Sequence, residues 1–214
     1  MLKATEHLPW FMGGNTDSAT AFESTMKNNP FCEFTPELYM WFLYSSGGYV
    51  GELFKHVFID ERRNDFGEFL MHHLATVFLV FGSAYANQIG IGAIISWLHI
   101  ASDIPTAAVK VAASTHYNET TVVIYFIMIS GWFYFRLLCL PFWIINIFTN
   151  PVMGYPEHIS QFDVFHTLNG LYLVVIQILQ FYWFGLFMRM LYSYAKTGVA
   201  EDTQEKVEKS VKAE

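Results

Sequence analysis

The sequence predicts an all-α integral membrane protein with about five transmembrane helices. Of its 214 residues, 53% are hydrophobic and 18% are aromatic. Only 14% are charged, whereas roughly a quarter of the residues of a soluble domain are charged. Several apolar runs also reach the length of about 20 residues that is needed to cross the hydrocarbon core of a bilayer. A soluble fold would leave large apolar patches facing water, so lipid is the predicted solvent.

The first predicted span covers residues 38–58. Thr35 and Pro36 stand directly before it, and these residue types are preferred as N-cap and as first helical residue. The start of this helix is therefore well signalled.

The second predicted span covers residues 66–85, and the third covers residues 89–113. Asp65 and Glu68 precede and open the second span with the spacing of a capping box, with Asp in the Ser/Thr position. Pro105 lies near the end of the third span, where we expect a kink because proline removes a helical hydrogen bond.

The fourth predicted span covers residues 121–148, and the fifth covers residues 162–194. Pro141 lies late in the fourth span, so this helix is open to a break into a long and a short piece. The domain organisation that follows is a polar N-terminal segment (1–34), a transmembrane domain (35–196) and a charged C-terminal tail (197–214).

The charges and cysteines exclude several classes of function. The formal net charge of -7 disfavours binding to nucleic acids, which requires a basic surface. Cys32 and Cys139 lie far apart, so neither a disulfide framework nor a metal site is expected, and no resident cofactor is predicted. The N-terminal segment lacks the basic start and apolar core of a signal peptide.

Basic residues set the predicted orientation. With five spans, one side of the membrane holds only Lys3 and Lys27, and the other side holds most of the basic residues, namely Lys55, Arg62, Arg63, Lys110, Arg189, Lys196 and three lysines of the tail. The positive-inside rule places the C-terminus in the cytosol, or in the matrix if the membrane is the inner mitochondrial one.

Four ionisable residues inside the predicted spans need an explanation: His72, His73, His99 and Asp103. A charged group at the bilayer centre costs roughly 3 kcal/mol on insertion scales. The paired histidines enter from the basic side, roughly 10 to 12 Å deep at about 1.5 Å per residue. Asp103 lies seven residues before Lys110 on a span that runs the other way, which gives a similar depth. His99 is four residues before Asp103, so both project from one side of the helix.

This group suits acyl transfer, because imidazole can act as base or nucleophile and a carboxylate can orient it. We therefore assign His72, His73 and Asp103 as candidate catalytic residues, and His99 as a candidate lipid-binding residue. For each histidine taken singly, a hydrogen bond to a neighbouring helix is the structural alternative. Arg136, inside the fourth span, is a candidate for lipid binding or for a contact with backbone carbonyls or a carboxylate.

The stretch D-E-R-R-N-D-F-G-E-F-L-M-H-H-L-A-T at residues 60–76, followed by L-H-I-A-S-D-I at 98–104, resembles the signature block of ceramide synthases in the TLC-domain family. The likeness covers most of residues 8–190. It implies a helical barrel around a lipid tunnel, and an enzyme that joins fatty acyl-CoA, its co-substrate, to the amino group of a sphingoid base. The matching positions are His72 and His73 for the paired histidines and Asp103 for the second acid of an H-D-x-x-D stretch.

The chain departs from that pattern in two ways. Ile100 follows His99 where the family has an acid, and Pro105 and Thr106 stand where the family has a glutamate shortly after the second acid. The matching region also begins at the start of this chain, so we expect an incomplete barrel whose gap a neighbour covers.

Three functions remain open. The first is a catalytically degenerate, lipid-binding accessory subunit of a larger membrane complex, such as a mitochondrial respiratory complex. The second is a shortened but active acyl-CoA-dependent N-acyltransferase whose barrel is closed by a homodimer. The third is a lipid sensor or transport factor. The endoplasmic reticulum and the mitochondrial inner membrane are both open as locations.

Overall fold

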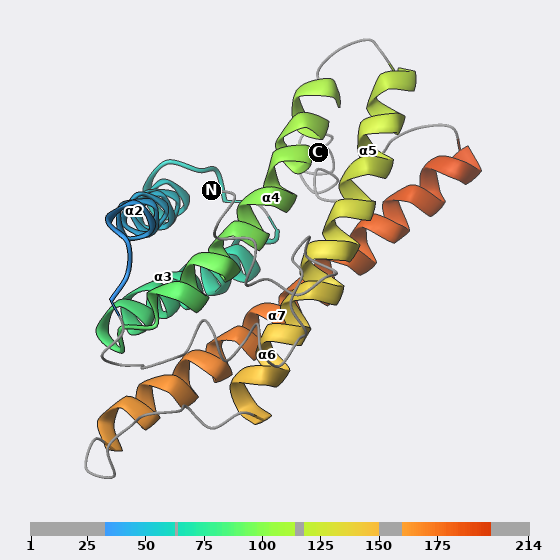
Figure 1. The fold of residues 1–214 in the computed structure, drawn as a ribbon. Helices are drawn as coiled ribbons and strands as arrows, with labels where there is room; N and C mark the ends of the chain where they lie inside the picture. Colours follow the sequence, from blue (N-terminus) through green and yellow to red (C-terminus); the bar gives the residue numbers. More distant parts are fainter. Residues whose placement is uncertain (1–32, 63, 114–117, 150–159, 198–214) are drawn as a thin grey trace.

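The structure is a computed structural model that describes residues 33–62, 64–113, 118–149 and 160–197. The described residues form helices, with no strand among them (Figure 1). The elements in chain order are α2 (Pro36–Phe58), α3 (Phe66–Tyr85), α4 (Ile89–Ala113), α5 (Asn118–Trp132), the π-helix η3 (Phe133–Cys139), α6 (Leu140–Thr149) and α7 (Ser160–Thr197). Residues 1–32 and the predicted charged tail from 198 on lie outside the described residues.

Four of the described helical segments are long and apolar enough to cross a membrane: α3, α4, the continuous segment from α5 to α6, and α7. The first predicted span (38–58) is also a helix, α2, but it is not among these four. Its 23 residues are sufficient in length. The small and polar residues in its middle, Ser45, Ser46, Gly47, Gly48 and Glu52, lower its hydropathy, and the prediction of five spans did not weigh them.

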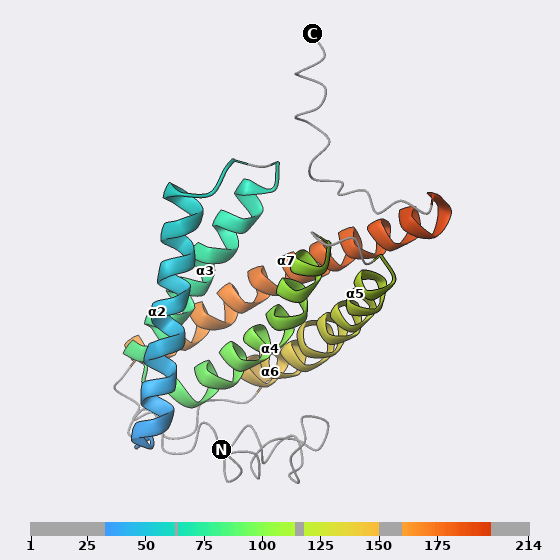
Figure 2. The same ribbon diagram turned by 90° about the horizontal axis from the view of Figure 1, so that it is seen from above.

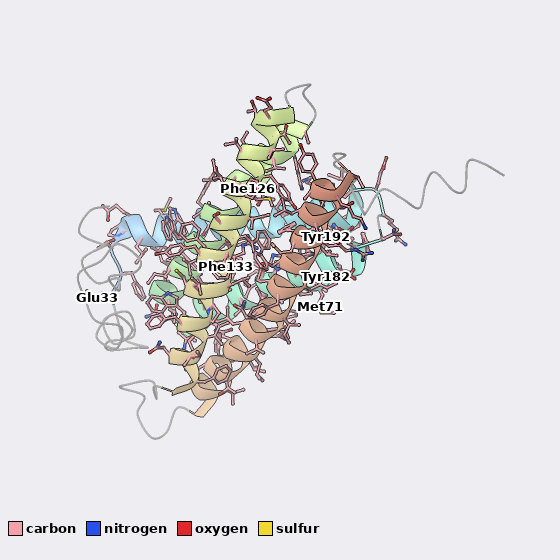
Figure 3. All side chains as sticks on the ribbon, turned by 90° about the vertical axis from the view of Figure 1, so that its right-hand side faces the viewer. Glu33, Met71, Phe126, Phe133, Tyr182 and Tyr192 are labelled. Carbon is pink, nitrogen blue, oxygen red and sulfur yellow. The ribbon has the colours of Figure 1, made fainter. Side chains whose placement is uncertain are left out.

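Apolar side chains cover the outer surface of the bundle. Figure 3 labels five of them, Met71, Phe126, Phe133, Tyr182 and Tyr192, which come from α3, α5, η3 and α7. Their exposed fractions run from 45% for Phe133 and Tyr182 to 69% for Tyr192. Patches of this extent are unfavourable in water, which agrees with a helical integral membrane protein.

The two predicted helix starts have different outcomes. The Thr35 hydroxyl accepts a hydrogen bond from the Leu38 N–H at 3.4 Å, and Pro36 is the first helical residue, so the predicted start of α2 is confirmed. α3 does begin after Asp65, but the Asp65 side chain makes no capping hydrogen bond. The predicted capping box is therefore wrong.

Proline does not break either helix. Pro105 lies inside the continuous helix α4. Near Pro141 the fourth span does not break but changes its hydrogen-bond register. The π-helix η3 ends just before Pro141, and the Leu140 N–H bonds to the Phe135 carbonyl. In this register the Arg136 carbonyl would pair with residue 141, which has no N–H because it is proline. The side-chain amide of Gln177 on α7 donates to that carbonyl instead, at 3.1 Å.

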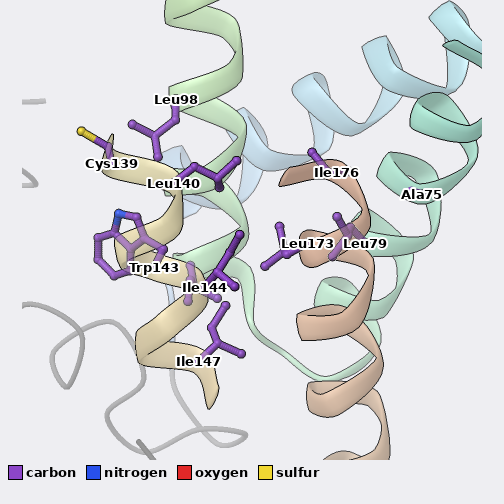
Figure 4. Close-up of a cluster of buried hydrophobic side chains, with 11 residues drawn as sticks. Ala75, Leu79, Leu98, Cys139, Leu140, Trp143, Ile144, Ile147, Leu173 and Ile176 are labelled. Carbon is purple, nitrogen blue, oxygen red and sulfur yellow. The ribbon is translucent and has the colours of Figure 1, made fainter. Parts of the chain in front are cut away.

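The helices pack into one bundle. α7 packs against α3 and α6, α4 packs along α5, and α2 packs against α3 and α4 (Figures 1 and 2). The largest buried apolar cluster lies between α3, α4, α6 and α7 (Figure 4). Its centre is formed by Leu98, Leu140 and Trp143, which are fully buried. This cluster holds together the four elements that carry most of the candidate site.

Candidate functional site

A pocket of about 60 Å³ lies between α2, α3, α4, α6 and α7. His72 and Thr76 line it from α3, Tyr49 from α2, and His99 and Asp103 from α4. A volume of this size holds a few water molecules, since one water takes up about 30 Å³ in the liquid. A lipid tail would therefore need the helices to move apart.

The structure brings His72, His99 and Asp103 to this one pocket. Ring centroids of His72 and His99 are 6.3 Å apart. His99 is buried, and its Nδ1 lies 2.8 Å from the Ile95 carbonyl oxygen. Because a carbonyl only accepts, Nδ1 carries the proton, and Nε2 of the neutral ring is a hydrogen-bond acceptor. Both His72 Nδ1 and His99 Nε2 are buried and have no hydrogen-bond partner among the described residues.

His73 does not line the pocket. Successive residues on an α-helix are turned by about 100°, so neighbours in the chain face different directions. The ring of His73 lies 5.3 Å from that of His56 and 6.4 Å from that of Phe69. The expected convergence of both paired histidines with Asp103 is thus found for His72 only.

Arg136 is the most buried charge of the site, with 2% of its surface exposed. Its guanidinium forms an ion pair with Asp103 Oδ1. It also donates to Ser102 Oγ at 2.5 Å, to Gln180 Oε1 at 3.0 Å and to the His99 carbonyl at 3.2 Å. Arg136 therefore contacts both a backbone carbonyl and a carboxylate, two of the partners considered from the sequence.

The flat side of the same guanidinium is also occupied. It lies 4.0 Å above the ring of Trp132, in cation–π geometry, and the Trp132 indole N–H donates to the Gln180 carbonyl at 3.4 Å. Arg136 thus ties α4 and α7 to the segment formed by α5 and η3.

Three groups at the site were missed from the sequence. Gln180 accepts a hydrogen bond from the Arg136 side chain, and Gln177 donates one to the Arg136 carbonyl. His56 contacts His73. The two glutamines stand three residues apart in an otherwise apolar run, so they face the same side of α7. That spacing was the available signal, but neutral amides are less costly in a membrane than charges and attract less attention.

Among the described residues, no group of three or more His, Cys, Asp or Glu side chains is arranged to hold a metal ion. The imidazole and carboxylate groups that line the pocket belong to His72, His99 and Asp103, and Asp103 is already paired with Arg136. Groups of these types can form hydrogen bonds and transfer protons.

Comparison with known proteins identifies relatives. A family model described as the TLC domain matches residues 7–189. Human ceramide synthase 4 is 35% identical over 183 residues, which is 84% of this chain and 44% of that protein. ASC1-like protein 1 of Oryza sativa subsp. japonica is 28% identical over 167 residues, covering 76% of this chain and 54% of that protein. Ceramide synthase hyl-2 of Caenorhabditis elegans is 26% identical over 186 residues, covering 84% and 56%.

The chain thus spans about half the length of the curated relatives it matches. No solved structure matches it. Since the family model covers most of the sequence and the relatives include ceramide synthases of several organisms, this chain belongs to the TLC-domain family and is ceramide synthase-like.

Proposed function

We propose that this protein is a catalytically degenerate member of the ceramide synthase-like group that binds lipid and serves as an accessory subunit of a larger membrane complex. One observation carries the proposal. Asp103, the acid that lines the pocket beside the histidines, is paired with Arg136.

Acyl transfer by an imidazole depends on a carboxylate that fixes its tautomer and stabilises its charged form. In the described part of the chain, neither His72 nor His99 bonds to a carboxylate, and the Nδ1 proton of His99 goes to a backbone carbonyl. Ile100 stands where the ceramide synthase pattern has a further acid. The pocket therefore keeps its imidazoles without the acids that would activate them.

The outer surface supports lipid contact and assembly. Apolar side chains cover α3, α5 and α7, which suits lipid or the helices of a neighbour. On α2, a Cβ added at Gly47, Gly48 or Gly51 would meet no atom of the described residues within 4 Å. Small residues in a row allow close approach of another membrane helix. We propose that neighbouring subunits pack here, with a homodimer as the arrangement of the alternative below.

An active acyl-CoA-dependent N-acyltransferase is the second candidate, and a different observation favours it. His72 and His99 line one pocket, and in the part of the chain that the structure describes neither His72 Nδ1 nor His99 Nε2 has a hydrogen-bond partner, so either ring can accept a proton or an acyl group. In that function His72 is the base or acyl acceptor, His99 and Asp103 assist it, and a fatty acyl-CoA is the co-substrate.

A direct assay separates the two functions. The full chain is purified in mild detergent and incubated with a long-chain base and a fatty acyl-CoA, and the N-acyl product is measured. We expect no turnover and co-purification of other membrane subunits in fixed stoichiometry. The proposal fails if the wild type turns over and His72→Ala abolishes this, while Met71→Ala, a matched change on the exposed outer face, does not.

A gain-of-function variant tests the reason for the missing activity. Ile100→Asp restores an acid next to His99 on the same helix, at a position that is 37% exposed. If the lost acid is the cause of inactivity, this variant acquires N-acylation that the wild type lacks.

We propose the inner mitochondrial membrane or the endoplasmic reticulum as the location, with the C-terminus on the matrix or cytosolic side. The excess of basic residues near that side supports this orientation. Accessibility of a cysteine introduced at the C-terminus to an impermeant thiol reagent would test it.

A further inference from the structure

Five buried side-chain polar atoms have no hydrogen-bond partner in the described part of the chain: His72 Nδ1, His99 Nε2, Gln177 Oε1, Gln180 Nε2 and Trp183 Nε1. Buried polar atoms are nearly always satisfied, and one left unpaired costs about 1–3 kcal/mol. Five such atoms in one membrane bundle require an explanation.

These atoms belong to one neighbourhood, which we call the polar seam. The His72 ring lies 6.3 Å from the His99 ring and 5.3 Å from the Trp183 ring. On α7, Gln180 is three residues before Trp183 and Gln177 is three residues before Gln180, so each is a neighbour of the next on the helix surface. Arg136 joins the two glutamines to His99, because it bonds to all three residues.

The other bonds of these residues fix which atoms donate and which accept. Arg136 donates to Gln180 Oε1, so the free end of that amide is the donor Nε2. The Gln177 Nε2 group donates to the Arg136 carbonyl, so the unpaired atom of the Gln177 amide is the acceptor Oε1. The Nδ1–H group of His99 donates a hydrogen bond to the Ile95 carbonyl, which leaves Nε2 as an acceptor. Trp183 can only donate.

The seam therefore offers both donors and acceptors, and this restricts its ligand. A phosphodiester, as in the headgroup of a phospholipid, has no proton to give to His99 Nε2 or Gln177 Oε1, and a doubly charged phosphate monoester has none either. An ammonium group cannot accept from Trp183 or Gln180, and the nearby Arg136 charge repels it. A hydroxyl group both donates and accepts.

We propose that the polar seam binds hydroxyl groups, those of water molecules or of a lipid alcohol. The pocket that reaches His72 and His99 has a volume of about 60 Å³, which is enough for a few waters. Occupancy by water is independent of the proposed function, whereas occupancy by a lipid alcohol rests on the proposed binding of lipid.

The test is solid-state NMR of the full chain, labelled with ¹⁵N-histidine, in phosphatidylcholine bilayers, which contain no lipid hydroxyl. The peaks of the two rings are identified with His72→Gln and His99→Gln. We expect magnetisation to pass from water to His72 Nδ1 and His99 Nε2. Adding a diacylglycerol tests the second source: replacement of the water contacts by contacts to its hydroxyl proton assigns the seam to lipid, and persistence of the water contacts assigns it to water.

A pair of variants extends the test to α7. Trp183→Phe removes the indole donor and keeps an aromatic ring against His72, and we expect loss of water contact at His72. Trp97→Phe is the matched control, because Trp97 is 39% exposed and packs on Phe135, and it should leave the contact unchanged. The proposal is overturned if both rings of the wild type receive magnetisation neither from water nor from the lipid hydroxyl.

Discussion

The ion pair between Asp103 and Arg136 allows a quantitative prediction. The Asp103 side chain is 57% exposed, and that of Arg136 is 3% exposed. Asp103→Ala leaves the buried guanidinium without a counter-charge, and removing one partner of a fully buried pair costs about 3–5 kcal/mol. Here the exposure of the carboxylate weakens its attraction to the guanidinium, and Arg136 keeps its hydrogen bonds to three neutral acceptors. We therefore expect a loss of about 2–3 kcal/mol in the free energy of unfolding.

The chain contains a matched control for this change. Glu52 is also 57% exposed and lies 3.4 Å from Lys55, which is 51% exposed. Pairs of this kind contribute about 0–1 kcal/mol, so Glu52→Ala should have little effect. Asp103→Asn keeps an acceptor oxygen for Arg136 but removes the negative charge, and it should cost about 1 kcal/mol, the difference between a hydrogen bond to a charged acceptor and one to a neutral acceptor.

Equilibrium unfolding in mixed detergent and SDS micelles, followed by tryptophan fluorescence, measures all three variants. The expected order of stability is Glu52→Ala, then Asp103→Asn, then Asp103→Ala as the least stable. If Asp103→Ala and Glu52→Ala are equally stable, burial of one partner does not decide the strength of the pair, and the argument above is refuted.

Two further predictions use the same assay. A Cβ at Gly82 would collide with the side-chain amide of Asn169, so Gly82→Ala should cost about 1–3 kcal/mol. At Gly47 the added Cβ meets open space among the described residues, so Gly47→Ala should gain about 0.5–1 kcal/mol from helix propensity. Equal effects of the two changes would contradict the close approach of Asn169 to Gly82. Gln177→Leu should cost about 1–3 kcal/mol because it leaves the buried Arg136 carbonyl unpaired. The cost should be smaller in a Pro141→Ala background, because residue 141 then has an N–H for that carbonyl. An equal cost in both backgrounds would show that Gln177 does not stand in for the N–H that residue 141 lacks.

The spans that the sequence predicts best are those with continuous apolar runs. Residues 66–85 and 89–113 match α3 and α4 to the residue, since the polar breaks at their ends are sharp. The first span was predicted least well as a membrane span, because the prediction considered its length and not the low hydropathy of its central serines and glycines. The register change before Pro141 was not predicted, since it depends on Gln177, a residue 36 positions later in the sequence, to satisfy the carbonyl.

The site was predictable in depth but not in direction. Counting residues from the membrane surface predicted that His72, His99 and Asp103 could converge, and all three line the pocket. The same count could not separate His72 from His73, because adjacent residues share a depth and differ in their angle around the helix axis. The partner of Asp103 also stayed open, since it depends on how α4 packs against η3.

The order in which the partners of Arg136 occur along the chain bears on how the protein enters the bilayer. His99, Ser102 and Asp103 are synthesised before Arg136, and Gln180 is synthesised after it. A lone arginine at the centre of a helix costs about 2.5–3.5 kcal/mol on insertion. Because its carboxylate is already present on α4, the two helices can insert together as a hairpin whose charges cancel, and α7 then completes the assembly around them.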